Sequence, residues 1–139
     1  PEGYAVDPKG VALDESKVYS GERSVRLTKK PAKKSIVSLR QRFDAEPGTW
    51  YRAKVRYQAD VSKGVPHIIF TAFGKNGQWL RHQGGARGLT KTGDKWTELS
   101  VDTKCEDDTS QLMVEFFFYD DQSDGVAWID DFEVAKIKK

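Results

Sequence analysis

Polar and apolar side chains alternate over residues 51–58, which places chemically active groups on one face of an extended chain. The apolar series is Tyr51, Ala53, Val55 and Tyr57, and the polar series is Arg52, Lys54, Arg56 and Gln58. Because neighbouring residues of a strand point to opposite faces, the polar series shares one face, where arginine can bind carboxylate or sulfate groups bidentately. This face predicts either a groove for an anionic polymer or the solvated outer surface of a sheet. Arg40 and Arg42 extend the basic surface if their strand joins the same sheet.

Residues 112–119 form a segment that is apolar on both faces. One face is Leu112, Val114, Phe116 and Phe118, and the other is Met113, Glu115, Phe117 and Tyr119. An outer face with two aromatic rings indicates either that a second layer covers it or that the rings line a binding groove. Aromatic rings offer flat apolar area, which suits the CH face of a sugar ring.

A tryptophan surrounded by hydrogen-bonding side chains is a second candidate for sugar binding. Trp79 follows a glycine-rich turn at residues 74–77 and precedes Arg81 and His82. This composition is typical of a sugar-binding loop, and the alternative is a tryptophan that caps the edge of the fold. Trp96 and Trp128 lie in alternating segments, and we interpret both as core residues.

Motifs that would indicate an enzyme are absent from the sequence. There is no G-x-S-x-G, no phosphate-binding P-loop, no H-E-x-x-H and no paired cysteine motif. Adjacent carboxylates such as Asp120 and Asp121 point to opposite faces when they lie on a strand, so they do not form the facing pair of a glycosidase. We therefore predict no catalytic residues.

The elements that must position these groups are strands. Segments with a period of two are separated by turn signals about every ten residues, which is typical of an all-β fold. We expect eight to ten strands in a two-sheet antiparallel β-sandwich of the jelly-roll type. The length of 139 residues fits a single domain spanning residues 1–139.

The overall charge, taken alone, points to no nucleic-acid or membrane partner. The chain has 23 Lys and Arg against 21 Asp and Glu, a net charge of +2, which is too balanced to indicate a nucleic-acid or membrane partner. No stretch approaches the ~18 apolar residues of a spanning helix. Cys105 is the single cysteine, so neither an internal disulfide nor a cysteine-rich zinc site is possible.

Four segments, in order and spacing, resemble strands of the β-sandwich carbohydrate-binding modules of the families numbered 4, 9 and 22. They are S-G-E-R-S-V-R-L at residues 20–27, P-G-T-W-Y-R-A-K-V at 47–55, D-K-W-T-E at 94–98 and G-V-A-W-I-D-D-F-E-V at 125–134. The resemblance covers nearly the whole chain. It implies a jelly roll whose concave sheet holds a glycan.

The resemblance also implies a setting for the module. Such modules are usually appended to secreted polysaccharide-degrading enzymes, so we expect an extracellular, monomeric domain cut from a larger protein. Arg56 matches a concave position that is often aromatic in the family, which suggests a uronate or sulfated sugar. Glu115, Phe117 and Tyr119 match a strand that usually contributes ligand contacts.

A structural calcium ion is a further implication of the resemblance. Family members commonly hold calcium near the start of the chain and the closing aspartate. By position, Asp130 would supply its carboxylate, and Ser20 and Glu22 would supply carbonyl oxygens, with Glu2 or Asp14 as alternatives. Calcium takes six to eight oxygen ligands.

Three functions follow from these patterns. In the first, a non-catalytic module binds a polysaccharide or oligosaccharide through stacking and polar groups. The stacking residues are Trp79, Phe117 and Tyr119, and the polar ones are Arg56, Lys54, Gln58, Arg81, His82 and Glu115. In the second, the protein is a small polysaccharide lyase. Tyr119, His82 and Arg56 would then provide the base near the sugar C5 and neutralise the uronate group. In the third, the aromatic face docks another protein.

Overall fold

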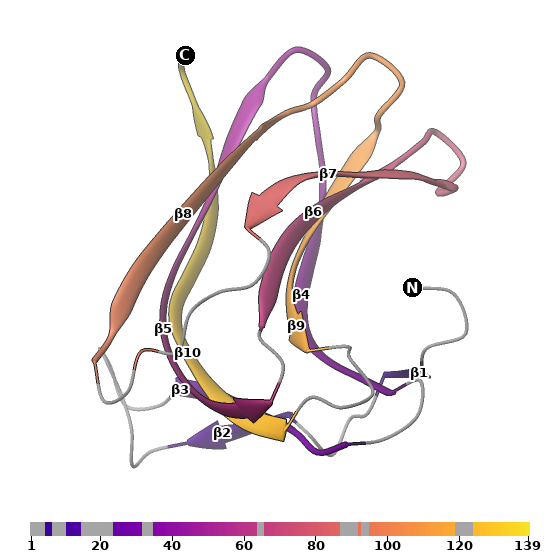
Figure 1. Ribbon diagram of the computed structural model, residues 1–139. Coiled ribbons are helices and arrows are strands. Elements are labelled where there is room, and N and C mark those ends of the chain that lie inside the picture. The colour runs from indigo at the N-terminus through magenta and orange to yellow at the C-terminus, as the bar shows by residue number, and fades with distance from the viewer. Residues whose placement is uncertain are drawn as a thin grey trace.

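The structure, a computed structural model, describes residues 5–6, 11–14, 24–31, 35–63, 66–86, 92, 95–118 and 124–139. These residues form ten strands (Figure 1). The bounds are β1 Ala5–Val6, β2 Val11–Asp14, β3 Ser24–Lys29, β4 Ser35–Asp44, β5 Trp50–Lys63, β6 His67–Phe73, β7 Trp79–Ala86, β8 Thr97–Lys104, β9 Gln111–Phe118 and β10 Asp124–Ile137. Within these ranges, no helix has the length and apolar character needed to cross a membrane.

Two five-stranded sheets pack face to face. We name them the β9 sheet, with strand order β1-β4-β9-β6-β7, and the β10 sheet, with order β2-β3-β10-β5-β8. Neighbouring strands are antiparallel except for the parallel pair β1 and β4. The predicted all-β, two-sheet jelly roll is confirmed.

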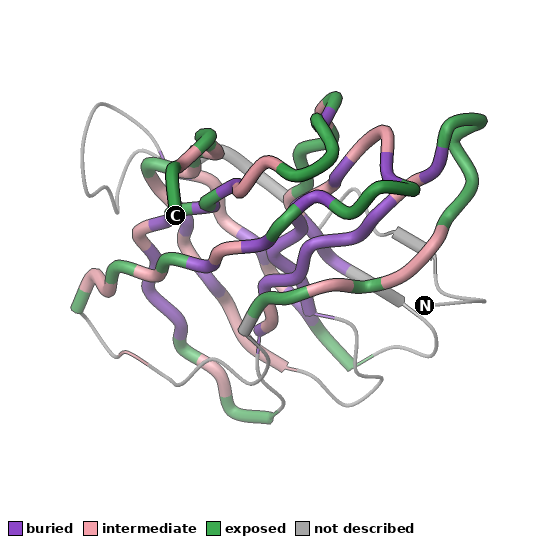
Figure 2. Tube along the Cα trace, turned by 90° about the horizontal axis from the view of Figure 1, so that it is seen from above, coloured by how far each residue is buried: buried purple, intermediate pink, exposed green. Residues whose placement is uncertain are grey.

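The core lies between the sheets and is built from alternate residues of each strand. Val55 and Tyr57 of β5 and Val114 and Phe116 of β9 belong to one buried cluster. The rings of Tyr57 and Phe116 meet across the sandwich, with centroids 5.8 Å apart. Figure 2 shows the buried stretches along the central strands and the exposed ones toward their ends. The alternation predicted for residues 51–57 is confirmed.

Strand β7 was not predicted, because its sequence resembles a loop. It pairs with β6 from Phe73 and Trp79 to Ile68 and Ala86, and it turns toward β8 in Figure 1. Gln83 links β7, the edge strand of one sheet, to β8, the edge strand of the other. Its Nε2 donates to Thr103 Oγ1 and to the Lys104 carbonyl, both at 2.8 Å. This contact closes one side of the sandwich.

The interpretation of Trp128 as a core residue was wrong. Its neighbours Ala127 and Ile129 are buried in the core, so Trp128 points to the outer face of the β10 sheet. There it lies opposite Gln58 on one side and Arg26 on the other. The segment is apolar on both faces, which hides the direction of alternation.

Candidate functional site

Among the described residues, the outer face of the β9 sheet carries a group of aromatic and hydrogen-bonding side chains. Strands β4, β9 and β6 bend so that this face lies inside the bend in Figure 1. The strand registers arrange its side chains in rows that cross the sheet. Two of these rows are Arg42–Met113–Thr71–His82 and Asp44–Gln111–Phe73–Trp79.

Trp79 is an exposed aromatic residue at the edge of this face. The residue is 57% exposed, and no other large apolar residue in the described ranges is exposed. The tight turn before it is held by hydrogen bonds from the Gly74 N–H to the Gln78 carbonyl at 2.8 Å and from the Gly77 N–H to the Gly74 carbonyl at 2.9 Å. Gly77 has φ +78°, a conformation that glycine adopts without steric cost. The turn therefore fixes where Trp79 begins β7.

His82 supports Trp79 from the neighbouring row. The two rings meet edge to face, with centroids 5.5 Å apart. His82 Nδ1 lies 3.0 Å from Thr71 Oγ1, within hydrogen-bond distance, and Thr71 is buried. This chain of contacts ties the exposed indole to the interior of the sheet.

A polar network continues the Trp79 row across the sheet. Arg42 Nε donates to Gln111 Oε1 at 2.7 Å, and Gln111 Nε2 donates to Asp44 Oδ1 at 2.9 Å. The Arg42 guanidinium also lies over the Phe73 ring, 3.7 Å from its centroid. The network presents donors and acceptors at fixed positions beside the indole, the arrangement that orients a polar ligand.

Glu115 and Phe117 lie deeper on this face than the sequence suggested. The Glu115 carboxylate accepts a hydrogen bond from Arg40 Nη2 at 2.6 Å, and its side chain is 8% exposed. Phe117 is 4% exposed and packs on His67, with ring centroids 5.5 Å apart. Phe117 therefore offers little free ring surface for stacking.

Arg81 serves a different purpose from its neighbours on β7. It pairs with Asp108, and it donates to Gln83 Oε1 at 3.2 Å and to Thr109 Oγ1 at 3.4 Å. The hydrogen bond from Arg81 lowers the pKa of the Asp108 carboxyl. Arg81 thus joins β7 to the turn between β8 and β9.

Arg56, Lys54 and Gln58 lie on the other side of the molecule. They point outward from β5 in the β10 sheet, whereas Trp79, His82 and Glu115 point outward from the β9 sheet. The structure therefore does not bring the predicted site residues into one groove. Arg40 and Arg42, on β4, also lie in the other sheet and do not extend the β5 surface.

The cations of β5 are matched by carboxylates of β8. Arg52 donates to both oxygens of Asp102, at 2.8 and 3.0 Å. Glu98 lies 2.8 Å from Arg56 and 3.3 Å from Lys54. This face is not the free basic groove for an anionic polymer that the sequence allowed, because each cation of the series has a partner of opposite charge.

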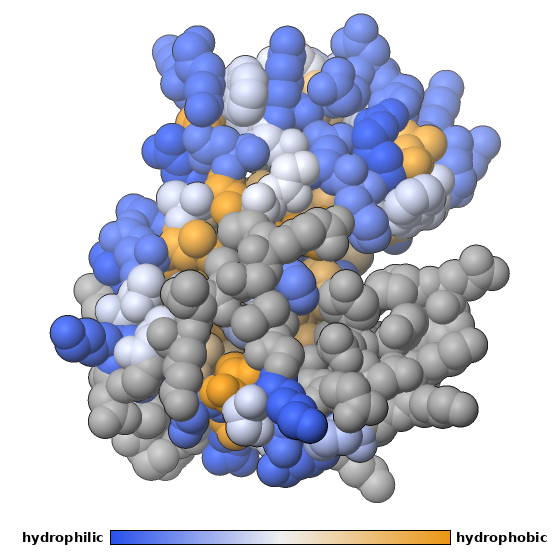
Figure 3. Space-filling model, viewed as in Figure 1, coloured by the Kyte–Doolittle hydropathy of each residue, from blue (hydrophilic) through white to orange (hydrophobic). Residues whose placement is uncertain are grey.

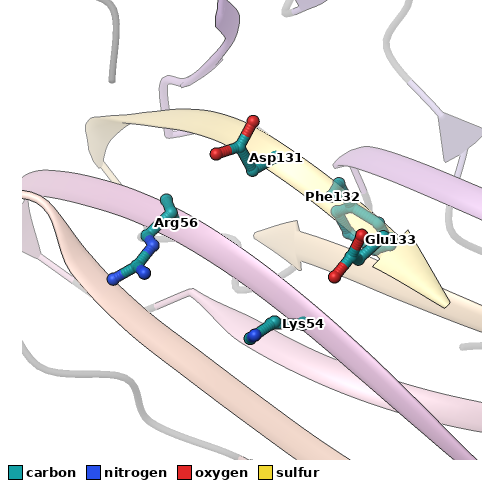
Figure 4. A pocket seen from close by; sticks show the side chains of 5 residues that line it. All are labelled: Lys54, Arg56, Asp131, Phe132 and Glu133. Carbon is teal, nitrogen blue, oxygen red and sulfur yellow. The ribbon is translucent and has the colours of Figure 1, made fainter. Parts of the chain in front are cut away.

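A cavity of about 240 Å³ opens where β10 bulges away from β5. Figure 4 shows Lys54 and Arg56 reaching from β5, and Asp131, Phe132 and Glu133 from β10. Asp131 adopts φ +50°, and its N–H donates to Asp130 Oδ1 at 2.8 Å. The bulge thus places the carboxylates of Asp131 and Glu133 beside the cations Lys54 and Arg56 on the outer face.

The predicted calcium ligands are only partly described. Asp130 lies on β10, while Ser20 and Glu22 fall outside the described residues, as does Tyr119. Within the described ranges, no group of three or more His, Cys, Asp or Glu side chains could hold a metal ion. The proposed lyase residues are also separated, since His82 and Arg56 lie on opposite faces.

Sequence comparison identifies no relative, because no protein-family model and no curated protein matches the chain. Its fold, however, is that of β-sandwich carbohydrate-binding modules. A family 16 carbohydrate-binding module is 19% identical, with a TM-score of 0.68 over 96% of this chain and 87% of the other. The CBM22-1 xylan-binding domain of Paenibacillus barcinonensis Xyn10C is 15% identical, with a TM-score of 0.62 over 93% of this chain and 81% of the other.

Enzymes also contain this fold. The enzymatically active domain of tailspike protein 4 from bacteriophage CBA120 is 14% identical with a TM-score of 0.68, over 97% of this chain and 18% of the other. At these identities the likeness establishes the fold alone. What a domain of this fold binds depends on the side chains of its site.

Proposed function

We propose that this chain is a non-catalytic module that binds a glycan on the outer face of the β9 sheet. The observation that carries the proposal is the exposed Trp79 indole beside the Arg42–Gln111–Asp44 network. A sugar ring stacks its CH face on Trp79, while its hydroxyls exchange hydrogen bonds with Arg42, Asp44 and His82. The likeness to carbohydrate-binding modules supports this assignment.

Among the described residues, Trp79 is the one large apolar side chain that is exposed, which favours a polar ligand over a protein partner. In Figure 3 the upper part of the view is mostly hydrophilic, and hydrophobic atoms show only in small separate areas. A docking face for a protein would carry a larger continuous apolar patch. One exposed tryptophan among polar groups fits a sugar better.

A preference for acidic sugars would depend on Arg42. Arg40 is paired with Glu115, whereas Arg42 donates to the neutral amide of Gln111. The Arg42 guanidinium therefore has capacity for a uronate or sulfate group. Arg42, rather than Arg56, would then bind the acidic group of the sugar.

Affinity electrophoresis against neutral and acidic polysaccharides tests the proposed function. We expect at least one polysaccharide to retard the protein. If the ligand is acidic, Arg42→Gln reduces the retardation, and if it is neutral, the variant has a smaller effect. Absence of retardation by every polymer would contradict the glycan-binding function.

In a larger protein, the module would hold an appended polysaccharide-degrading enzyme at its substrate outside the cell. Binding raises the local concentration of enzyme on the polymer without changing the chemistry. Deleting the module from the parent enzyme should then slow hydrolysis of insoluble polymer and leave hydrolysis of soluble oligosaccharide unchanged. Light scattering should give the mass of a monomer.

A structural calcium ion near Asp130 is part of the same proposal. Its ligands would be the Asp130 carboxylate and oxygens of Ser20 and Glu22, and the ion would stabilise the fold without taking part in binding. EDTA should lower the melting temperature of the protein, and Asp130→Asn should remove this difference. Equal melting temperatures with calcium and with EDTA would contradict the assignment.

A further inference from the structure

Arg42 reaches from β4 across the β9 sheet toward the turn that precedes Trp79. Its Nε donates to Gln111 Oε1 of β9 at 2.7 Å, and its guanidinium lies 3.7 Å from the centroid of the Phe73 ring of β6. A Cβ atom built at Gly77 would lie 3.7 Å from Arg42 Nη2, so the Nη end of the guanidinium lies beside the turn. These contacts fix the direction of the guanidinium close to the exposed indole.

The two Nη groups of Arg42 have no acceptor in the described part of the chain, because its hydrogen bond uses Nε. No carboxylate among the described residues lies within ion-pair distance of Arg42 either. Two other arginines of this sheet differ in this respect, since Arg40 is paired with Glu115 and Arg81 with Asp108. The Nη groups of Arg42 therefore remain available to a ligand.

Positive charge exceeds negative charge around the indole. The Gln111 amide accepts from Arg42 and donates to Asp44 Oδ1 at 2.9 Å, so the Asp44 carboxylate is held by a neutral group and not by a cation. Lys75, in the turn before Trp79, is exposed and forms no ion pair within the described ranges. Arg42 and Lys75 against Asp44 leave a positive charge in excess, which attracts an anion.

The surface that these groups form is open to a ligand. Trp79, Arg42 and Lys75 are all exposed, whereas Glu115, farther along β9, is buried. An acidic sugar matches this surface in two ways, since its CH face fits the indole and its oxyanion fits the guanidinium. Arginine binds an oxyanion through paired N–H groups, and these charge-assisted hydrogen bonds are stronger than those to a neutral hydroxyl.

We infer that the glycan bound at Trp79 is acidic and that a carboxylate or sulfate group of its sugar lies against the Nη groups of Arg42. The inference rests on the proposed function and names the class of ligand that the site takes. The sugar ring stacks on the indole, and its acidic group faces the guanidinium. Lys75 contributes through its charge. Arg42 is then the residue that determines the specificity of the module.

Polymers that differ only in charge test the inference. The probes are polygalacturonate, alginate and glucuronoxylan, each compared with its carboxyl-reduced form, and dextran sulfate compared with dextran. Affinity electrophoresis gives the dissociation constants, with the mobility of each protein referred to its mobility in a polymer-free gel. We expect at least one acidic polymer to bind roughly tenfold or more tightly than its neutral counterpart. The pair of polymers that shows this preference identifies the acidic group as uronate or sulfate.

Substitutions of Arg42 show whether this residue carries the preference. Arg42→Gln should remove most of it, because the amide has neither the charge nor the paired donors. Arg42→Lys should retain only part of it, because an ammonium group keeps the charge but lacks the planar fork. Arg52→Gln is the matched control, since it removes the same charge from the opposite sheet, and it should leave the preference unchanged.

Two results would overturn the inference. One is that no acidic polymer binds more tightly than its neutral counterpart, while at least one neutral polymer binds and Trp79→Ala weakens that binding. The proposed function would then stand. The other is an equal loss of preference in Arg42→Gln and Arg52→Gln, which would mean that the whole chain attracts polyanions without a specific site. Absence of binding to every polymer would contradict the proposed function itself, and the inference with it.

Discussion

The Arg40 guanidinium and the Glu115 carboxylate meet at 2.6 Å across the β4–β9 pair. The carboxylate is nearly buried, whereas the guanidinium is partly open to solvent. Arg40 also bonds the Ser38 hydroxyl at 3.0 Å. The pair therefore fixes the row of side chains next to the proposed glycan site.

Removing Arg40 should cost more stability than removing its neighbour Arg42. Arg40→Met leaves the Glu115 carboxylate buried without its partner, and we expect a loss of about 1–3 kcal/mol in the free energy of unfolding. Arg42→Met removes contacts that are exposed to solvent, so its loss should stay below ~1 kcal/mol. Urea unfolding of both variants measures the difference. Equal losses would show that the Arg40–Glu115 pair adds nothing beyond an exposed contact.

Acid should weaken the fold through Asp102. Hydrogen bonds from Arg52 and from Lys139 lower the pKa of Asp102 from 3.8 to about 2. The folded state therefore binds this proton less readily than the unfolded state, so the stabilisation is complete above the ordinary pKa and is lost as the pH falls toward 2. The carboxyl carbon signal of Asp102 followed through an acid titration measures this pKa.

Arg52→Met provides the matched test of the cause. Without Arg52, the Asp102 carboxyl should titrate closer to its ordinary value, and the protein should lose less stability on acidification. A wild-type Asp102 that titrates near 3.8 would rule out this contribution.

Gly85 should tolerate no side chain. A Cβ atom at this position would lie 2.2 Å from the Ile68 carbonyl oxygen and 2.9 Å from Ile69 Cα, and φ is +125°. We expect Gly85→Ala to cost roughly 3 kcal/mol or more in the free energy of unfolding. Gly48→Ala is the control, because φ is +83° there but nothing lies within 4 Å, and it should cost about 1–2 kcal/mol. Similar losses for the two variants would contradict the close packing of β7 on β6.

The faces of single strands could be predicted from the sequence. Alternation over residues 51–57 identified the side chains of β5 that enter the core, because burial on one side of a strand imposes a period of two. The same rule failed at Trp128, where apolar residues occupy both faces. It also failed at β7, where Gly85 pairs with Ile69 of β6 and Gln83 contacts β8.

The grouping of the site residues could not be predicted, because it depends on strand order. Alternation shows which residues share a strand face, but not which strands are neighbours. Strand β5 lies between β10 and β8, and β9 lies between β4 and β6, so Arg56 and Glu115 belong to different sheets. Long-range pairing therefore separated residues that sequence patterns had combined. For the same reason, the sequence did not identify Gln111 and Phe73 as residues of the site.

Replacement of Trp79 tests the central claim most directly. The measurement is the affinity of Trp79→Ala and Trp79→Phe for a polysaccharide that retards the wild type. We predict that Trp79→Ala loses roughly tenfold or more in affinity while Trp79→Phe, which keeps a flat ring, loses less. Both free energies of unfolding should stay within about 0.5 kcal/mol of the wild type, as for exposed side chains generally. Undiminished affinity in a folded Trp79→Ala protein would contradict the account.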